Sequence, residues 1–244
     1  MQAFDVAASG RVARAHGRRL SLDGSAPIDL DFEPLRCKFR GEDLVVLGRK
    51  SELLSVAADG KVRGVVRVRD AALDVAVLKG GSIVVSYGRR GLERHGVTLE
   101  RLGDAPCVFK DAALLDATCL AAESGAVWVL GTAAEPPTSR ALRLRPVATG
   151  LAAREVVPLP APPRSAAVGP DGALYVLLEP GESCVRVDAG AASVPVRLRG
   201  PLHSLARHGR RLLGCGAKGI EDLSRLVPRP LADARRPELP PCSS

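Results

Sequence analysis

The sequence predicts an all-β protein of repeated units, and three observations support this. A turn glycine followed by an apolar run recurs along the chain, with steps of 31, 40, 44, 47 and 37 residues between the glycines. These glycines are Gly10, Gly41, Gly81, Gly125, Gly172 and Gly209. The apolar runs, such as LVVL at 44–47 and IVVS at 83–86, have the length of strands. No stretch of 12 residues combines helical periodicity with freedom from Gly, Pro and β-branched breaks.

A period of about 40 residues with strand–turn–strand character is typical of a β-propeller, in which each unit is one four-stranded antiparallel blade. We therefore predict a propeller of six blades, with five or seven as alternatives. The blades occupy residues 1–227 as a single domain, and the Pro-rich residues 228–244 form a C-terminal tail. We expect the ring to close by pairing between the terminal segments.

Each unit follows one formula, in which an extended stretch turns at glycine and continues in an apolar strand. The first unit carries Gly10, Gly17 and Gly24, which predict three successive hairpins. Glycine is favoured there because hairpin turns place residues at positive φ. The next units contain CKFRGEDLVVLG, VAVLKGGSIVVSY, LAAESGAVWVLG, AAVGPDGALYVLL and SLARHGRRLLGCG. The continuous apolar runs suit inner strands, while alternating runs such as VVRVRD at 65–70 suit outer strands with one wet face.

One segment departs from the formula. Residues 133–164 hold seven prolines, and proline is excluded from central strands, so we expect an extended insertion at a blade edge.

One blade carries a resemblance to known families. GPDGALYVLL at 169–178, followed by CVRVDAG at 184–190, resembles the blade pattern of NHL and gluconolactonase-like propellers. The Gly-His and Trp-Asp signatures of WD-repeat propellers are absent, so no specific family is assigned. Gluconolactonase-like propellers hold a divalent ion with Glu, Asp and Asn ligands. This chain has no Asn, so the resemblance does not carry that ligand set over in its usual form.

Composition bears on compartment and partners. The formal net charge is +8 and the pI about 9.6, which favours acidic partners, although the charge is spread along the chain. We expect a soluble, cytoplasmic protein of bacterial type, since no window has the length of a membrane span or the apolar core of a signal peptide. The six cysteines form no CxxC pair, and we expect them to be small hydrophobic residues in strands.

Arginine-rich turns are the first candidate site. HGRRL occurs at 16–20 and 208–212, and YGRRG at 87–91. The two HGRRL copies are out of phase with the repeat, because the first falls in a middle hairpin and the second in an innermost one. This favours ordinary turn chemistry. The alternative is a basic surface for an anionic partner, with an affinity that falls steeply with salt. Its residues are Arg18, Arg19, Arg89, Arg90, Arg210 and Arg211.

A position three or four residues after the turn glycine recurs in five units. Its residues are Val45, Val84, Trp128, Tyr175 and Leu213. Three units have an aliphatic side chain there and two have an aromatic one, so we interpret it as a packing position between blades rather than a stacking platform for bases.

Catalytic motifs are lacking. The sequence has no GxSxG elbow, HExxH or Gly-rich phosphate loop, and His203 and His208 would point to opposite faces of a strand. Four carboxylates could still converge at one rim, although solvated turn residues are the simpler interpretation. They are Asp116, Asp171, Asp188 and Glu182.

The sequence therefore favours a non-catalytic protein–protein interaction module, a scaffold subunit of a larger assembly that binds a protein through one propeller rim. No cofactor or metal and no membrane association are expected. Two alternatives stay open: a metal-dependent hydrolase or lactonase with an atypical carboxylate site, and a nucleic-acid-associated protein that uses the Arg-rich turns.

Overall fold

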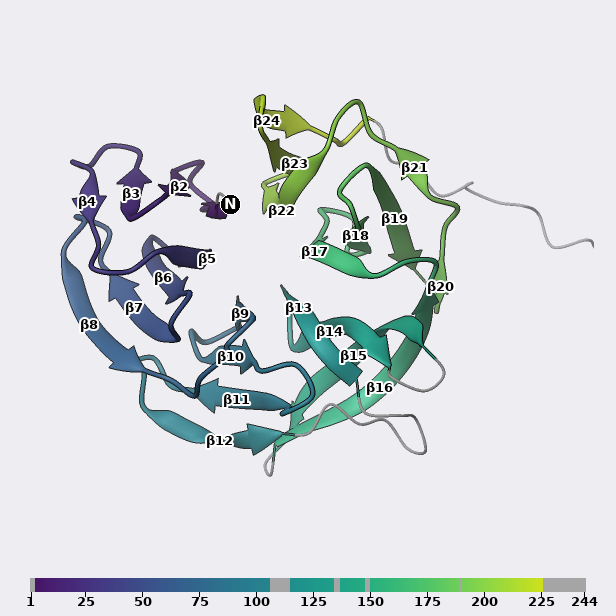
Figure 1. Ribbon diagram of the computed structural model, residues 1–244, viewed down its shortest axis with the longest axis horizontal. Helices are drawn as coiled ribbons and strands as arrows, with labels where there is room; N and C mark the ends of the chain where they lie inside the picture. Colours follow the sequence, from purple (N-terminus) through teal and green to yellow (C-terminus); the bar gives the residue numbers. More distant parts are fainter. Residues whose placement is uncertain (1–2, 106–114, 134–136, 148–149, 189, 226–244) are drawn as a thin grey trace, which may run out of the picture.

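The computed structural model describes residues 3–105, 115–133, 137–147, 150–188 and 190–225, and they form a ring of six antiparallel sheets (Figure 1). Blade 1 contains β1 (Ala3–Val6), β2 (Val12–His16), β3 (Arg19–Leu22) and β4 (Ile28–Asp29). Blade 2 contains β5 (Pro34–Arg40), β6 (Asp43–Gly48), β7 (Glu52–Val56) and β8 (Val62–Arg67). Blade 3 contains β9 (Asp74–Val77), β10 (Ile83–Ser86), β11 (Leu92–His95) and β12 (Arg101–Ala105).

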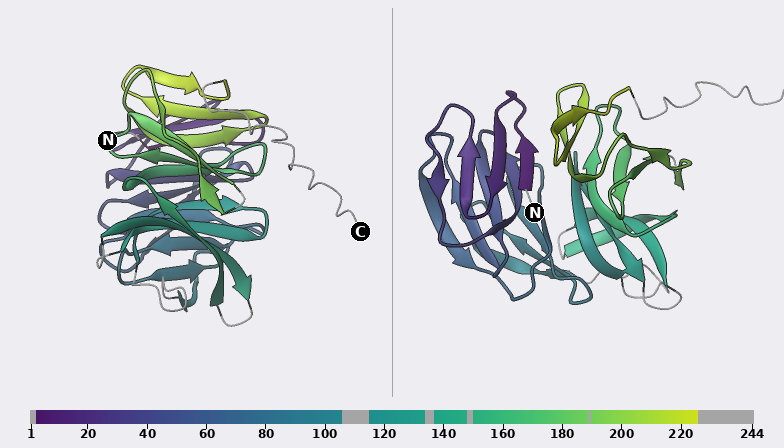
Figure 2. Two further views of the ribbon diagram at one scale, coloured as in Figure 1. Left: turned by 90° about the vertical axis from the view of Figure 1, so that its right-hand side faces the viewer. Right: turned by 45° about the horizontal axis from the view of Figure 1, so that its top comes forward.

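The second half of the ring follows the same order. Blade 4 contains β13 (Leu115–Glu123), β14 (Ala126–Ala133), β15 (Thr138–Val147) and β16 (Gly150–Leu159). Blade 5 contains β17 (Pro163–Val168), β18 (Leu174–Leu178), β19 (Ser183–Asp188), β20 (Ala191–Ala192) and β21 (Val196–Arg197), and the last two both pair with β19. Blade 6 has three described strands, β22 (Leu202–His208), β23 (Arg211–Gly216) and β24 (Gly219–Asp222). The predicted six-bladed, all-β propeller is confirmed, and Figure 2 shows its twisted sheets standing side by side around the axis.

The six turn glycines each connect the first and second strands of a blade. All have positive φ, between +55° at Gly209 and +95° at Gly10. Residues with a Cβ are strained in that region, which explains why glycine recurs there. Gly17 and Gly24 also have positive φ and make the second and third turns of blade 1, as predicted.

The core is divided among the interfaces between blades. Val45 packs with Val75 and Ile83 of blade 3, and Trp128 packs with Leu174 of blade 5. Val84, Tyr175 and Leu213 lie in the corresponding clusters of the next interfaces. The recurring position is therefore an inter-blade packing position, as predicted. Cys37, Cys119, Cys184 and Cys215 are buried and free, as expected of small hydrophobic residues, while Cys107 and Cys242 lie outside the described residues.

The expected closure by strand pairing is wrong for the described strands. No strand of blade 1 pairs with blade 6. Blade 1 takes all four of its strands from residues 3–29 and so reaches the usual four strands without one from the other terminus. The two blades instead meet through side chains, with Phe4 and Val6 against Ala206 and Cys215.

The Pro-rich segment also differs from expectation. Instead of an insertion, β15 and β16 form the outer hairpin of blade 4, each ten residues long. Pro146 lies one residue from the end of β15, and Pro158 lies in the outermost strand β16, where a missing N–H is tolerated. The predicted tail at 228–244 lies outside the described residues.

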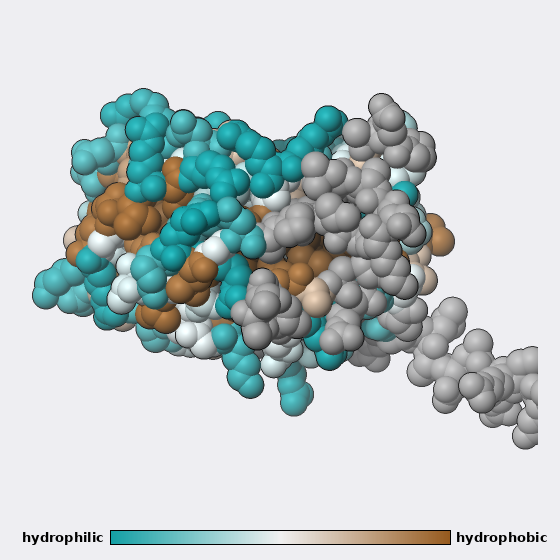
Figure 3. Space-filling view, turned by 90° about the horizontal axis from the view of Figure 1, so that it is seen from below, coloured by the Kyte–Doolittle hydropathy of each residue, from teal (hydrophilic) through white to brown (hydrophobic). Residues whose placement is uncertain are grey.

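The outer wall combines charged and apolar side chains (Figure 3). In β8, an edge strand, Val62 and Val65 are 49% and 56% exposed and alternate with Arg63 and Arg67. Charged residues on an edge strand oppose pairing with another chain. The described part of the chain holds no helix that is long and apolar enough to cross a membrane.

Candidate binding site at the mouth of the central channel

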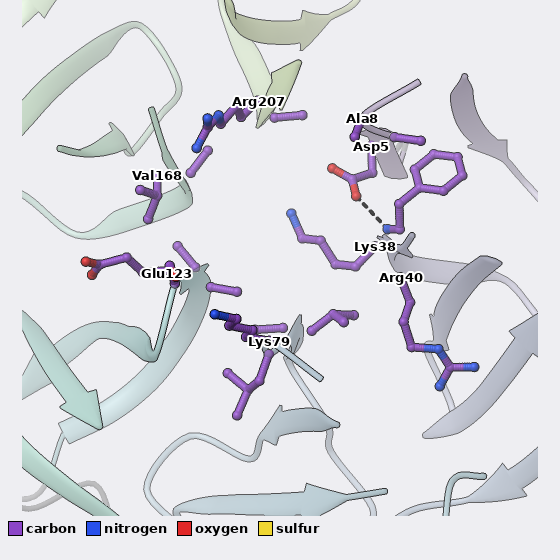
Figure 4. A pocket seen from close by; sticks show the side chains of 18 of the residues that line it. Asp5, Ala8, Lys38, Arg40, Lys79, Glu123, Val168 and Arg207 are labelled. Carbon is purple, nitrogen blue, oxygen red and sulfur yellow. Dashed lines mark hydrogen bonds between the residues drawn. The ribbon is translucent and has the colours of Figure 1, made fainter. Parts of the chain in front are cut away.

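The central channel opens into a cavity of about 810 Å³ at the end where the first hairpin of each blade turns. Residues of all six innermost strands or their turns line it (Figure 4). The channel is wide at this end because small side chains occupy the register position that lines it in four of the six blades. The residue that pairs with the inter-blade packing position is alanine in four blades, at Ala76, Ala121, Ala167 and Ala206. Asp5 and Lys38 occupy the same register position in blades 1 and 2.

Asp5 links two blades at this mouth. Its Oδ2 accepts a hydrogen bond of 2.7 Å from the backbone N–H of Phe39, and the residue is only 9% exposed. Burial raises the pKa of the Asp5 carboxyl, and the nearby Lys38 opposes that shift. An innermost strand has no inner neighbour, so its backbone donors require such partners. Asp5 is thus mainly a structural residue.

The cations of the mouth form no ion pair with a carboxylate of the described residues, although the Asp5 carboxyl lies near Lys38. Lys38 extends toward the middle of the opening, and Lys79 and Arg207 border it from other blades (Figure 4). Among the described residues, neither Lys38 nor Lys79 forms an ion pair, and the Nε of Arg207 donates to the carbonyl of Gly209 at 3.2 Å. A concave site in which positive charges outnumber negative ones focuses the electric field and attracts anions.

The remaining charged residues at the mouth are engaged elsewhere. Arg40 points away from the opening and donates to the carbonyl of Val97 at 2.7 Å and to Ser55 Oγ at 3.0 Å. Glu123 also points away, accepting hydrogen bonds from Trp128 Nε1 at 3.1 Å and from Arg143. The opening therefore presents net positive charge from Lys38, Lys79 and Arg207.

The six arginines of the predicted basic surface do not lie together. Arg18, Arg89 and Arg90 are in turns between second and third strands, and Arg19 begins the third strand of blade 1. Arg210 and Arg211 follow a first strand, and successive turns of a meander alternate between its two ends. Four of the six are thus on the rim opposite the channel mouth. Three form long ion pairs, Arg19 with Asp29 at 3.7 Å, Arg89 with Asp116 at 3.9 Å and Arg211 with Asp222 at 3.7 Å.

The four candidate carboxylates do not converge either. Asp171 and Asp188 both bind Arg186, at 3.2 and 2.7 Å, whereas Asp116 lies beside Arg89 on the other rim. Burial by itself raises the pKa of Asp171, but hydrogen bonds from Tyr175, the N–H of Ala173 and Arg186 together hold it below its usual value. The backbone of Glu182 accepts from Leu198. Throughout the described residues, no three His, Cys, Asp or Glu side chains are grouped to hold a metal ion.

Sequence reasoning missed Lys38, Lys79 and Arg207 because each is a single charge in or beside a strand. The signal that could have found two of them is register, since Lys38 and Ala206 share one position and Arg207 follows directly.

No protein-family model and no curated protein matches the sequence. Solved structures do match. The WD40 β-propeller domain of Doa1 has a TM-score of 0.68 at 7% identity, over 90% of this chain and 77% of that one. A catalytically inactive virginiamycin B lyase from Staphylococcus aureus has a TM-score of 0.64 at 13% identity, over 90% and 82%. The N-terminal part of BBS1, solved with ARL6, has a TM-score of 0.63 at 17% identity, over 87% and 73%. At these identities the similarity shows the fold alone: the chain has the β-propeller fold of WD40 domains and streptogramin B lyases. It is not assigned to either family.

Proposed function

We propose that this protein is a non-catalytic interaction module, a scaffold subunit that binds an acidic segment of a protein partner at the mouth of its central channel. The observation that carries the proposal is the set of three cations, Lys38, Lys79 and Arg207, around an opening of about 810 Å³, none of which forms an ion pair with a carboxylate in the part of the chain that the structure describes. Acidic side chains entering this opening would supply the missing counter-charges.

The fold is compatible with such a role. One of the similar structures, BBS1, was solved in a complex with the protein ARL6, and another is the WD40 β-propeller domain of Doa1. Others again are lyases, so the fold alone does not select a class, and the proposal depends on the charges of the mouth.

The test measures binding of a fluorescein-labelled (Glu-Ser)6 peptide to the full chain by anisotropy, with (Gln-Ser)6 as the uncharged comparison. The mouth variant K38Q/K79Q/R207Q removes three charges, and the control variant R18Q/R19Q/R89Q removes three from the opposite rim. Exposed ion pairs contribute roughly 0.2–1 kcal/mol each, so the mouth variant should bind about 3- to 150-fold more weakly. The control variant should bind like the wild type.

Equal losses in the two variants, or no binding of the acidic peptide to the wild type, would refute the proposal. A single-stranded oligonucleotide is the competing probe. If it binds more tightly than the peptide and loses affinity in the control variant, the nucleic-acid alternative replaces the protein-binding one. Thermal shifts with calcium and zinc test the hydrolase alternative, because a specifically bound ion raises the melting temperature.

A further inference from the structure

Three blades carry an arginine at one register position. It lies on the third strand, directly opposite the inter-blade packing position of the second strand. The pairs are Arg94 with Val84 in blade 3, Arg143 with Trp128 in blade 4 and Arg186 with Tyr175 in blade 5. The three guanidinium groups are therefore equivalent by the repeat, and their surroundings can be compared directly.

In blades 4 and 5 the arginine is neutralised by its own blade. Arg143 Nε donates to Glu123 at 2.9 Å, and its guanidinium lies 5.7 Å from the centre of the Trp128 ring. Arg186 donates to Asp171 at 3.2 Å, and the Tyr175 hydroxyl donates to the same carboxylate at 2.7 Å. In both blades the carboxylate comes from the end of the first hairpin and an aromatic ring fills the adjoining space.

Blade 3 lacks both groups. Its first turn is closed by the same two backbone hydrogen bonds as that of blade 5, Leu78 N–H to Ser82 O and Gly81 N–H to Leu78 O, which fixes the alignment of the two loops. In that alignment Gly80 stands where blade 5 has Asp171. Gly80 has a φ of +91°, a conformation in which an aspartate would be strained.

Arg94 therefore lacks the carboxylate partner that Arg143 and Arg186 have. Arg94 forms no ion pair among the described residues, and its Nε is buried with no hydrogen-bond partner. A buried donor without a partner is unfavourable, and a buried donor on a cation more so. Blades 4 and 5 show what satisfies this position, which is a carboxylate.

Arg94 lines a cavity of about 110 Å³ between blades 3 and 4, here named the Arg94 pocket. Its lining residues are Leu78, Lys79, Ser82, Arg94, Gly125 and Ala126. A water molecule occupies about 30 Å³ in the liquid, so the pocket has room for a carboxylate and a neighbouring methylene. Lys79 lines both this pocket and the channel mouth, so the two cavities adjoin.

We propose that the Arg94 pocket binds a carboxylate supplied by another molecule, namely an Asp or Glu side chain of the acidic segment that binds at the channel mouth. This inference rests on the proposed function and specifies it. The planar guanidinium offers two parallel N–H donors to a carboxylate, and Lys79 and the Ser82 hydroxyl add a charge and a further donor at the pocket wall. The partner side chain would take the place that Asp171 holds in blade 5.

The first measurement is NMR of arginine side chains in the full-length ¹⁵N-labelled protein, titrated with sodium acetate and, separately, with sodium chloride. The Arg94 Nε–Hε signal, identified by its loss in R94K, should shift saturably with acetate alone. The signals of Arg143 and Arg186, which are already paired, should not move. An Arg94 signal that responds equally to acetate and chloride would overturn the proposal.

The second measurement uses the (Glu-Ser)6 peptide with two single variants that each remove one charge. R94Q should weaken binding about 10- to 150-fold, the loss expected for one charge-assisted hydrogen-bonded pair, whereas the matched variant R18Q on the opposite rim should change it less than about twofold. If the wild type binds the peptide and R94Q binds equally well, the pocket proposal fails while the proposed function stands. If acetate shifts Arg94 but the peptide does not bind, the proposed function fails while the carboxylate site stands.

Discussion

Replacing Asp74 by alanine should destabilise the ring more than any exposed charge change, because this carboxylate joins three blades. Its Oδ2 accepts from the N–H of Leu120 in blade 4 at 2.7 Å, its Oδ1 from Val75 in its own strand at 2.8 Å, and Arg36 of blade 2 lies 3.3 Å away. The residue is 3% exposed. A hydrogen bond to a charged group contributes roughly 1.5–3 kcal/mol, so losing the two amide bonds costs about 3–6 kcal/mol. Arg36 keeps another interaction, so its contribution is left out of this sum.

The measurement is urea unfolding and thermal melting of D74A, D74N and the wild type. At about 2–4 °C per kcal/mol for a chain of this size, D74A should melt about 6–24 °C lower. D74N keeps the shape and one acceptor oxygen and should fall between. The control is D59A, which removes a carboxylate that only caps the exposed turn at Lys61, and it should melt close to the wild type. A D74A protein that melts within about 2 °C of the wild type would refute the idea that this carboxylate holds the blades together.

Three further substitutions test the packing of a glycine and one charge network. In G131A the new Cβ would overlap the backbone of Asp116 in the neighbouring strand, which cannot move aside, so a loss of about 1–3 kcal/mol or more is expected in urea unfolding. In G64A the Cβ meets open space at ordinary φ, and the change should be neutral or stabilising by about 0.4–1 kcal/mol. Equal losses of unfolding free energy in G131A and G64A would contradict the close packing of Gly131 against Asp116. Asp171 has a lowered pKa in the folded state, so its stabilisation is present above the usual value of 3.8 and is lost as pH falls through the folded pKa. The difference in unfolding free energy between wild type and D171N should therefore be larger at pH 7 than below pH 3, and a difference independent of pH would disprove the assignment.

The blade repeat was predictable because its constraint is local. A tight hairpin needs positive φ whatever surrounds it, so Gly10 to Gly209 mark the first turn of every blade from sequence alone. The packing position three or four residues later was predictable for a similar reason, since the turn fixes which residue faces the next blade.

Features that depend on the neighbouring blade were not predictable. The innermost strands of blades 2, 4, 5 and 6 each contain a β-bulge, leaving Leu35, Thr118, Arg164 and His203 unpaired in the register. Bulges respond to the packing of adjacent strands rather than to a residue type. The same holds for the link from Asp5 to Phe39, whose partners are 34 residues apart in the chain.

The residues of the proposed binding site are predictable from the sequence only when the blades are aligned with one another. Lys38 has no motif, yet four of the six blades have alanine in its place. Arg94 looks like any strand arginine until LKGGSIV at 78–84 is aligned with GPDGALY at 169–175, which shows that the acid and the ring are missing. In a repeat protein equivalent positions have similar surroundings, so the other blades show which side chains normally partner a given position. Arg94 occupies the register position of Arg143 and Arg186 without an acid from its own blade, and it lines a pocket that shares Lys79 with the channel mouth, which is why we infer that its partner comes from another molecule.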